Sequence, residues 1–574
     1  MLYARATRWL GVPYIERRLA LIAFVFTLPA LAMGLHADDY ILREQVLEGG
    51  PFAAYLFDPL DRQAAHARVL EERAAGRAPW WADEHQQVRF FRPLTSLSLW
   101  LDFEHGAPVW WMHLENGAIF AAIVWLAVAL YKQLGLSGAG LGWAAVFFGL
   151  DGALATSVGW IACRNTLLAV CFALACLLLH DRARRAGRPL LLVLSSLCFA
   201  LSLASGELGL CVLGYLGAHA LIVDRAPRMR RALALAPYAA VTSAYLVHYV
   251  TAGYGASREA LHRDVLHAPA AALLAWIEEV PVWLATTATA PVATLPLLIP
   301  ELRWPVLAFS LVVLVVLLRL LGSRSIELPH ARMLAIGALL SLVPLVTAPP
   351  QDRLRFFVAF GIYGVLGPWV ASHYDAPERF SRGVARVVWR VHAVWLPLLF
   401  VPVLFSISSP FGSGAARALD DVLPRQTTPI TIVLNPPSWT LPWYQSSMRA
   451  ARGEIGPPVF ALYAGSQSLD IQRLDDRSLE LHVARSWFAA PFNRVRDLSL
   501  EPFRAGDRIP LAHLTVEVRE VDEDGAPTRA RFTFDRSLDD AGLSFRYWHG
   551  TKLALWTPPP TGGRVQLSAS SALF

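Results

Sequence analysis

The 574-residue sequence has few charged residues for its length. Asp, Glu, Lys and Arg make up 17% of it, whereas soluble proteins carry about a quarter. Lysine is nearly absent, at Lys132 and Lys552 only, and this arginine bias is typical of GC-rich, mainly bacterial genomes. The low charge excludes an ordinary soluble enzyme of this size.

Cysteine is also scarce. All five cysteines fall within apolar segments: Cys163, Cys171, Cys176, Cys198 and Cys211. Such positions favour small buried side chains and exclude a disulfide framework. We expect no cofactor and no metal, because His36 beside Asp38 and Asp39 is too short a pattern to indicate a cation site.

Hydrophobic residues are abundant, at 55% of the sequence. Apolar runs of about 17–23 residues recur through the first 410 positions, long enough to cross a hydrocarbon core of about 30 Å. The pattern predicts a mainly α, polytopic bundle of about eleven spans, near 19–35, 110–131, 138–157, 160–179, 189–205, 207–223, 232–251, 303–321, 331–348, 355–372 and 388–408. Four prolines interrupt the stretch 268–300 and predict a kinked or re-entrant segment.

Arginines in the short loops predict the orientation. Arg17 and Arg18 precede the first run, so the positive-inside rule places the N-terminus in the cytoplasm. The arginine-rich loops 180–188 and 224–231 then fall on the same side, which means that the net charge of +6 reports topology and indicates no nucleic-acid partner. A cleaved signal peptide is the alternative for the first run. We favour a retained helix in a multi-pass protein of the bacterial inner membrane, its C-terminus outside.

Two non-membrane parts accompany the bundle. The outer loop 36–108 belongs with the membrane domain, 1–410, and Trp80-Trp81 would anchor it at the membrane interface. From 411 to 574 the pattern changes, and alternation about an Asp-Gly turn in 514–535 predicts a hairpin. We interpret 411–574 as a β-rich periplasmic domain that binds the acceptor and contributes no catalytic group.

The predicted topology gathers ionisable and polar residues on the outer side. They include Asp38, Asp39, Arg92, His113, Asn116, Arg164, Glu207, Asp352, Arg353 and Arg355. A carboxylate can take a proton from an acceptor hydroxyl, and arginines can hold a phosphate leaving group. Taken singly, each residue also has a structural explanation, as a loop cation, a helix cap or an ion pair. Their shared side favours transfer from a lipid-linked sugar phosphate.

Four segments carry a family resemblance. They are HADDYIL (36–42), FFRPLTSLSLWLDFEHGAPVWWMHLENGAIF (90–120), GWIACRNTLLAVCFALACLLLHDRAR (159–184) and SLVPLVTAPPQDRLRFFVAFGIYG (341–364). In this order they resemble the GT-C membrane glycosyltransferases. The most similar branch is that of the polyprenyl-phosphate-sugar-dependent O-mannosyltransferases of the transmembrane-and-tetratricopeptide type, although the repeats are absent here.

The resemblance implies roles for single residues. Asp38 or Asp39 would be the base that activates the acceptor, with Asp39 slightly preferred because it lies deeper in the loop. The other implied residues, for the donor phosphate or for supporting contacts, are Arg92, His113, Asn116, Arg164, Glu207 and Arg353. Glu207 lacks the lysine usual before it, and Phe120 stands where a histidine is common.

The function expected from the sequence is therefore an inverting glycosyltransferase. It would move a sugar, with mannose as one candidate, from a polyprenyl-phosphate donor in the bilayer to a hydroxyl of a protein or of an envelope glycan or lipid. A polytopic transporter and a catalytically inactive envelope-assembly scaffold stay open as alternatives. Against a transporter, the sequence has no two-fold repeat and its charges gather at one face.

Overall fold

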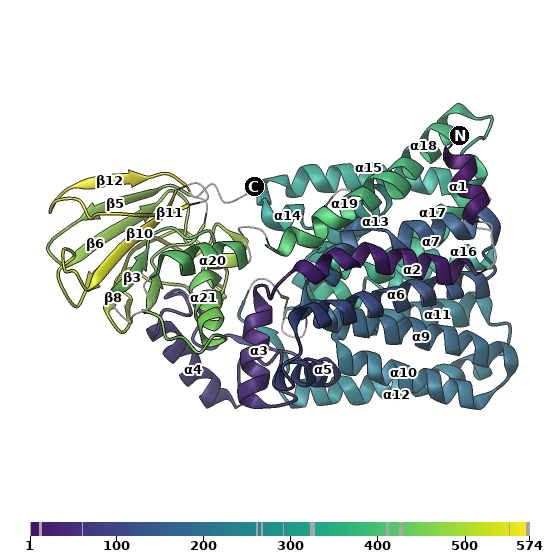
Figure 1. Ribbon diagram of the computed structural model, residues 1–574, viewed down its shortest axis with the longest axis horizontal. Coiled ribbons are helices and arrows are strands. Elements are labelled where there is room, and N and C mark those ends of the chain that lie inside the picture. Colours follow the sequence, from purple (N-terminus) through teal and green to yellow (C-terminus); the bar gives the residue numbers. More distant parts are fainter. Residues whose placement is uncertain are drawn as a thin grey trace.

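The computed structural model describes residues 2–569, apart from 11–13, 60, 260–261, 264, 266–267, 291, 322–327, 409–412, 424–428, 466 and 550–551. A long helical bundle and a smaller region rich in strands lie end to end (Figure 1). We call residues 413–569 the C-terminal region. The near end of the bundle faces this region, and the far end points away from it.

Long apolar helices build the bundle. Among the described residues, eight segments are long and apolar enough to cross a membrane: Val109–Gln133 (α6), Gly138–Gly159 (α7 with α8), Ile161–Ala186 (α9), Arg228–Thr251 (α12), Pro300–Arg319 (within η6–α15), Pro329–Thr347 (α16–η7), Phe356–His373 (α17) and Arg379–Ser408 (α18–η10). Two shorter apolar helices are Pro189–Ser205 (α10) and Glu207–Val223 (η4–η5). Each coincides with a run expected from the sequence, whereas the number of crossings stays a prediction.

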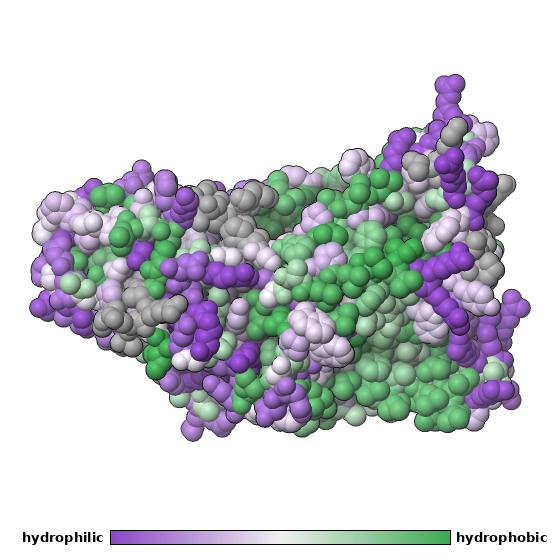
Figure 2. All heavy atoms as spheres, in the orientation of Figure 1, coloured by the Kyte–Doolittle hydropathy of each residue, from purple (hydrophilic) through white to green (hydrophobic). Residues whose placement is uncertain are grey.

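The first expected span is helical as well. Helix α2 (Ile15–Thr27) continues as the 3₁₀ turn Leu28–Ala32 and packs against α6. Figure 2 shows a broad apolar area over the visible face of the bundle, with hydrophilic side chains at the far end of the bundle and over the C-terminal region. On α15 (Arg303–Leu321), side chains such as Val312 and Leu318 are more than half exposed. Surface of this kind is stable in lipid.

The proline-broken stretch 268–300 holds α13 (Pro269–Thr289) and the short α14 (Leu295–Leu298). Before α13, the Arg263 N–H donates to the Thr347 carbonyl at 2.8 Å. After α13, the hydroxyl of Thr294 donates to Asp352 at 2.9 Å. Thr347 and Asp352 lie between α16 and α17, so both ends of the stretch return to the same short segment.

The C-terminal region combines two sheets with helices α20 (Ser413–Val422) and α21 (Thr440–Ala450). The order of the smaller sheet is β11-β10-β3-β4, with strands Lys552–Leu555, Leu543–His549, Ile430–Val433 and Val459–Ala461. The order of the larger sheet is β12-β5-β6-β9-β8-β7, with strands Arg564–Leu567, Leu469–Arg473, Ser478–Val483, Pro527–Phe534, Leu514–Val521 and Arg508–Pro510. Strands β8 and β9 confirm the hairpin expected at 514–535.

Strands β3 and β4 pair in parallel, and α21 forms the connection between them. Parallel neighbours require a crossover, and here the crossover is this helix. The expectation of a β-rich domain therefore omitted a β-α-β unit, whose helix lies against α3.

Trp80 and Trp81 are not membrane anchors, which corrects the expectation from the sequence. Both side chains are at most 2% exposed and belong to the hydrophobic core of the C-terminal region. Their indole N–H groups donate to the carbonyls of Leu462 and Asn493, at 2.9 and 3.1 Å. A tryptophan pair after a span resembles an interface belt in sequence, but buried partners from the distant C-terminal region cannot be seen there.

The loop between α2 and α6 also contributes α3 (Asp38–Gly49), α4 (Arg62–Ala74) and α5 (Pro93–Glu104). Its strand β1 (Gln87–Arg89) pairs with β2 (Gly255–Ser257), which lies between α12 and α13. Helix α3 lies across the near end of the bundle, between the bundle and α21 (Figure 1). This placement brings the Asp-Asp pair to the boundary between the two parts.

Candidate active site

Helix α3 begins at the Asp-Asp pair after an unusual turn. Ala37, the residue before it, has a φ of 47°, a conformation that costs free energy for any residue except glycine. Strained backbone of this kind gathers at functional sites. The turn presents Asp38 and Asp39 in the first turn of α3, where the helix dipole favours negative charge.

Asp39 is fully buried and uses both carboxylate oxygens for backbone contacts. Its Oδ2 accepts the His36 N–H at 2.8 Å, and its Oδ1 accepts the Ala162 N–H at 2.7 Å. Burial raises the pKa of Asp39 to about 8, although the two N–H groups favour the charged form. The side chain thus ties α3 to the start of α9, and it offers no free oxygen to a substrate.

Asp38 is only partly buried, and one of its carboxylate oxygens is not engaged in a hydrogen bond to the described part of the chain. Its Oδ1 accepts a hydrogen bond from the Tyr444 hydroxyl at 2.7 Å, while Oδ2 has no hydrogen-bond partner in the described part of the chain. Burial raises the pKa of Asp38, whereas the Tyr444 hydroxyl and the Arg353 guanidinium lower it. The geometry therefore favours Asp38, and not Asp39, as the group that can accept a proton from a substrate.

Arg353 provides the positive charge next to Asp38. Its Nε donates to Gln351 at 2.9 Å, its Nη1 contacts the Cys163 sulfur at 3.7 Å, and its guanidinium lies 5.2 Å from the ring centre of Trp160. Within the described ranges no carboxylate is close enough to Arg353 to form an ion pair. A half-buried arginine without a counter-ion is suited to an anionic ligand.

The C-terminal region contributes side chains to the same place. Tyr444 comes from α21, and Arg417 of α20 contacts His36 Nδ1 at 3.1 Å. Ser408, at the end of the bundle, contacts His36 Nε2 at 3.2 Å. Burial lowers the pKa of His36 to about 4, so this ring is neutral at physiological pH. Side chains of the C-terminal region therefore lie at the site, while the expectation that this region contributes no catalytic group stays a prediction.

Arg164 lies at the near end too, but it is saturated with partners. The side chain is 1% exposed. Its partners are Asn116 Oδ1 at 3.0 Å, Ser98 Oγ at 2.9 Å, the Met112 carbonyl at 3.2 Å, Glu115 at 3.0 Å and Asp102. Arg164 thus makes four hydrogen bonds and a further ion pair with Glu115, which join α5, α6 and α9 and occupy the guanidinium on all sides that a donor phosphate would need.

His113 and Asn116 support the backbone near Asp38. His113 Nε2 contacts the Gly34 carbonyl at 3.3 Å. The Asn116 amide donates to the carbonyls of Val158 and Trp160, each at 3.4 Å. Both side chains are buried, so they hold the segments that precede α3 and α9 and do not face a substrate.

Arg92 and Glu207 form a separate pair. Arg92 Nε donates to Glu207 at 2.8 Å, and its guanidinium lies over Tyr55 and Phe90, 4.7 and 4.4 Å from the ring centres. Tyr249 donates to the second oxygen of Glu207 at 3.3 Å. The pair closes the junction of α5 with η4 and leaves Arg353 as the unpaired arginine of the six expected binding residues.

Sequence reasoning missed several functional neighbours. Tyr444 stands in a part of the sequence with no motif, more than 400 positions from Asp38. Asp102 and Glu115 lie inside the second resembling segment, and a buried arginine requires carboxylate partners of this kind. Another buried network joins Arg355 to Asp151, which also accepts the Tyr363 hydroxyl.

The described residues contain no group of three or more His, Cys, Asp or Glu side chains that could hold an ion. The site therefore offers one accessible carboxylate, one unpaired guanidinium and a tyrosine hydroxyl.

Comparisons with known proteins give only loose similarities. No family model matches the chain, and no curated protein does. Among solved structures, ArnT from Cupriavidus metallidurans bound to undecaprenyl phosphate has a TM-score of 0.38 and 14% identity, over 77% of this chain and 85% of that one. Arabinofuranosyltransferase AftD from Mycobacteria has a TM-score of 0.34 and 16% identity, over 92% of this chain and 40% of that one. Similarities of this size assign neither fold nor activity to the chain.

Proposed function

We propose that this protein is a GT-C-type membrane glycosyltransferase that transfers a sugar from a polyprenyl-phosphate donor to a hydroxyl group. Asp38 is the base, and Arg353 binds the donor phosphate. The proposal depends on one observation above all: a carboxylate oxygen without a hydrogen-bond partner in the described part of the chain lies within electrostatic range of an arginine that has no carboxylate partner there. The four resembling segments support it, since two of them carry these residues.

The chemistry follows from the two charges. The free Oδ2 of Asp38 takes the proton of the acceptor hydroxyl. At the same time, the oxygen of that hydroxyl attacks the anomeric carbon of the donor sugar. The bond from that carbon to the phosphate oxygen breaks, and polyprenyl phosphate leaves with the bonding electrons. Arg353 neutralises the charge that develops on the phosphate. A single displacement inverts the anomeric carbon.

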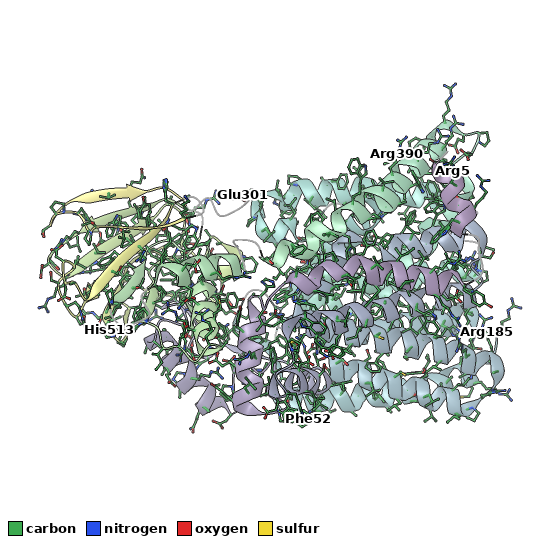
Figure 3. All side chains as sticks on the ribbon, viewed as in Figure 1. Arg5, Phe52, Arg185, Glu301, Arg390 and His513 are labelled. Carbon is green, nitrogen blue, oxygen red and sulfur yellow. The ribbon has the colours of Figure 1, made fainter. Side chains whose placement is uncertain are left out.

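The distribution of arginines supports an outward-facing site. Arg5, Arg185 and Arg390 lie at the far end of the bundle (Figure 3). The positive-inside rule assigns that end to the cytoplasm. The near end, with Asp38 and the C-terminal region, would then face the periplasm, where the phosphate-bearing sugar donor is lipid-linked.

Transfer in proteoliposomes tests the proposal. Purified protein would be reconstituted with a radiolabelled polyprenyl-phosphate sugar and an envelope glycan fraction, and label in the glycan would be measured. We expect transfer by the wild type and none by Asp38→Asn. Movement of label across the bilayer without a new covalent product would indicate a transporter, and no use of the donor at all would indicate an inactive scaffold.

A further inference from the structure

A cavity of about 340 Å³ and a second of about 280 Å³ lie where the loop after α2 meets the C-terminal region. The smaller one is bounded by α3, α4 and α21. Its walls include Ile41, Gln45, Glu48, Asp58, Arg77 and Trp443. Neither Asp38 nor Arg353 is among its lining residues, so it is distinct from the place of reaction.

One face of α3 joins this cavity to the base. Asp38, Ile41, Gln45 and Glu48 follow one another at intervals of three or four residues, which places them along one side of the helix. Asp38 and Gln45 are about 10 Å apart along the axis, at about 1.5 Å per residue. Along this side of α3, where Ile41 and Gln45 are 2% and 8% exposed, a glycan held in the cavity would have to continue for about 10 Å to reach the free oxygen of Asp38.

Helix α21 forms the opposite wall and fixes the spacing. Tyr444 binds Asp38, and one turn further Ser447 donates to Glu44 at 2.7 Å. Trp443, the residue before Tyr444, lines the cavity and is partly exposed. Its ring stacks on Trp439, with centroids 6.2 Å apart and planes 20° apart, and it lies edge-on to Phe57. The aromatic surface is thus held in place before any ligand arrives.

The charges of the cavity select against anions. Four carboxylates line it, at Glu44, Glu48, Asp58 and Glu72, against the two guanidinium groups of Arg68 and Arg77. Both arginines pair with Glu72. Within the described residues, Glu44, Glu48 and Asp58 have no ion-pair partner. Glu44 already accepts from Ser447 and Asp58 from the Val88 N–H, so Glu48 and the other oxygens of these two remain as hydrogen-bond acceptors, a role that carboxylates can fill for hydroxyl or amino groups and not for phosphates.

We infer that this cavity binds the acceptor, and that the acceptor is a glycan whose bound ring carries hydroxyl or amino groups and no negative charge. The inference rests on the proposed function and names the substrate class of the same site. Trp443 would stack on the ring, and Glu48 with its neighbours would accept hydrogen bonds from the ring's polar groups. The next sugar residue of the bound glycan would then present its hydroxyl to Asp38.

Binding of defined oligosaccharides to the full-length protein in nanodiscs tests this inference. The probes are a neutral hexose hexamer, an amino-sugar hexamer, an oligogalacturonate and an unglycosylated Ser/Thr-rich peptide. We expect the protein to retain the neutral hexamer or the amino-sugar hexamer. Which of the two it retains shows whether the acceptor ring carries hydroxyl groups alone or amino groups as well. We expect no retention of the anionic probe or the peptide.

Two variants locate the binding. Trp443→Ala and Glu48→Lys should each weaken oligosaccharide binding about tenfold, the loss of one such contact. Glu71→Lys makes the same charge change at an exposed position of α4 outside the cavity, and it should bind as the wild type does. Unchanged binding by both cavity variants, or peptide binding that Trp443→Ala abolishes, would overturn the inference.

Binding of polyprenyl phosphate to the same samples separates the two proposals. The cavity variants should bind this lipid as the wild type does, because Arg353 is untouched. If the wild type retains the oligosaccharide through Trp443 but does not bind the lipid, the glycan site stands and the donor assignment fails. If the lipid binds through Arg353 and no oligosaccharide does, the acceptor inference fails alone.

Discussion

The near end of the bundle holds two groups of charges that look alike in sequence and differ in structure. Around Arg164, every donor has a partner and the guanidinium is 1% exposed. Around Arg353, the Nη2 group has no hydrogen-bond partner in the described part of the chain, and the neighbouring Asp38 keeps a free oxygen. Buried charges that are fully paired join helices, whereas charges left unpaired at a solvent-accessible boundary are available for chemistry.

The largest effect is expected at Asp38. Asp38→Asn keeps the shape and the Tyr444 contact but removes the base, and we expect transfer to fall by about 10²–10⁴-fold. Detergent-solubilised protein should keep its melting temperature, since this carboxylate makes a single side-chain contact. Asp38→Asn with full transfer activity would remove the distinction between the two groups of charges.

Substitution of Arg164 should reduce stability, whereas substitution of Arg353 should reduce activity. Arg164→Ala leaves Asp102 and Glu115 without their cation, and we expect a loss of about 3–5 kcal/mol of stability. Arg353→Ala should leave stability unchanged and reduce kcat/KM for the donor about a hundredfold. Thermal unfolding and donor kinetics on the two variants measure both. A stable Arg164→Ala protein that has lost donor binding would reverse the assignment.

Tyr444 should affect the pH dependence of the reaction. Its hydroxyl lowers the pKa of Asp38, which burial raises, so Tyr444→Phe should raise that pKa further. Because the base acts in its ionised form, the acidic limb of kcat/KM against pH should move to higher pH, with a several-fold loss at neutral pH. Tyr547→Phe, another tyrosine of the C-terminal region, serves as the control. An unmoved limb in Tyr444→Phe would mean that Asp38 is not the titrating base.

The smallest effect is expected at Glu207. Glu207→Gln keeps hydrogen bonding to Arg92 but removes the ion pair, and the rings of Tyr55 and Phe90 still hold the guanidinium. We expect transfer to change less than threefold, about 0.6 kcal/mol. The same assay as for Asp38→Asn measures it. A loss comparable to that of Arg353→Ala would add the Arg92 pair to the donor site.

Much of the bundle could be predicted from sequence, because lipid imposes one strong constraint. Long apolar runs are helices, and the segments expected near 110–131 or 355–372 agree closely with α6 and α17. The hairpin at 514–535 could be predicted equally well, since the alternation of apolar and polar residues and the Asp-Gly turn are local signals.

The site was only partly predictable. The sequence identifies Asp38 and Arg353 as candidates, but it ranks Asp39 above Asp38, because depth in a loop says nothing about which oxygens the backbone occupies. It also cannot separate Arg164 from Arg353, since pairing depends on helices that meet only in the fold. Tyr444 was beyond reach for the same reason: no local pattern links α21 to α3.

The burial of Trp80 and Trp81 has a consequence for biosynthesis. Their hydrogen-bond partners stand 382 and 412 positions later in the chain. At about 5–20 residues per second, the ribosome needs about 20–80 s to reach those partners. During that interval two large aromatic side chains, already translocated if the site faces outward, have no core to enter. The nascent protein would therefore depend on a periplasmic chaperone or on the membrane surface to shelter this loop until translation ends.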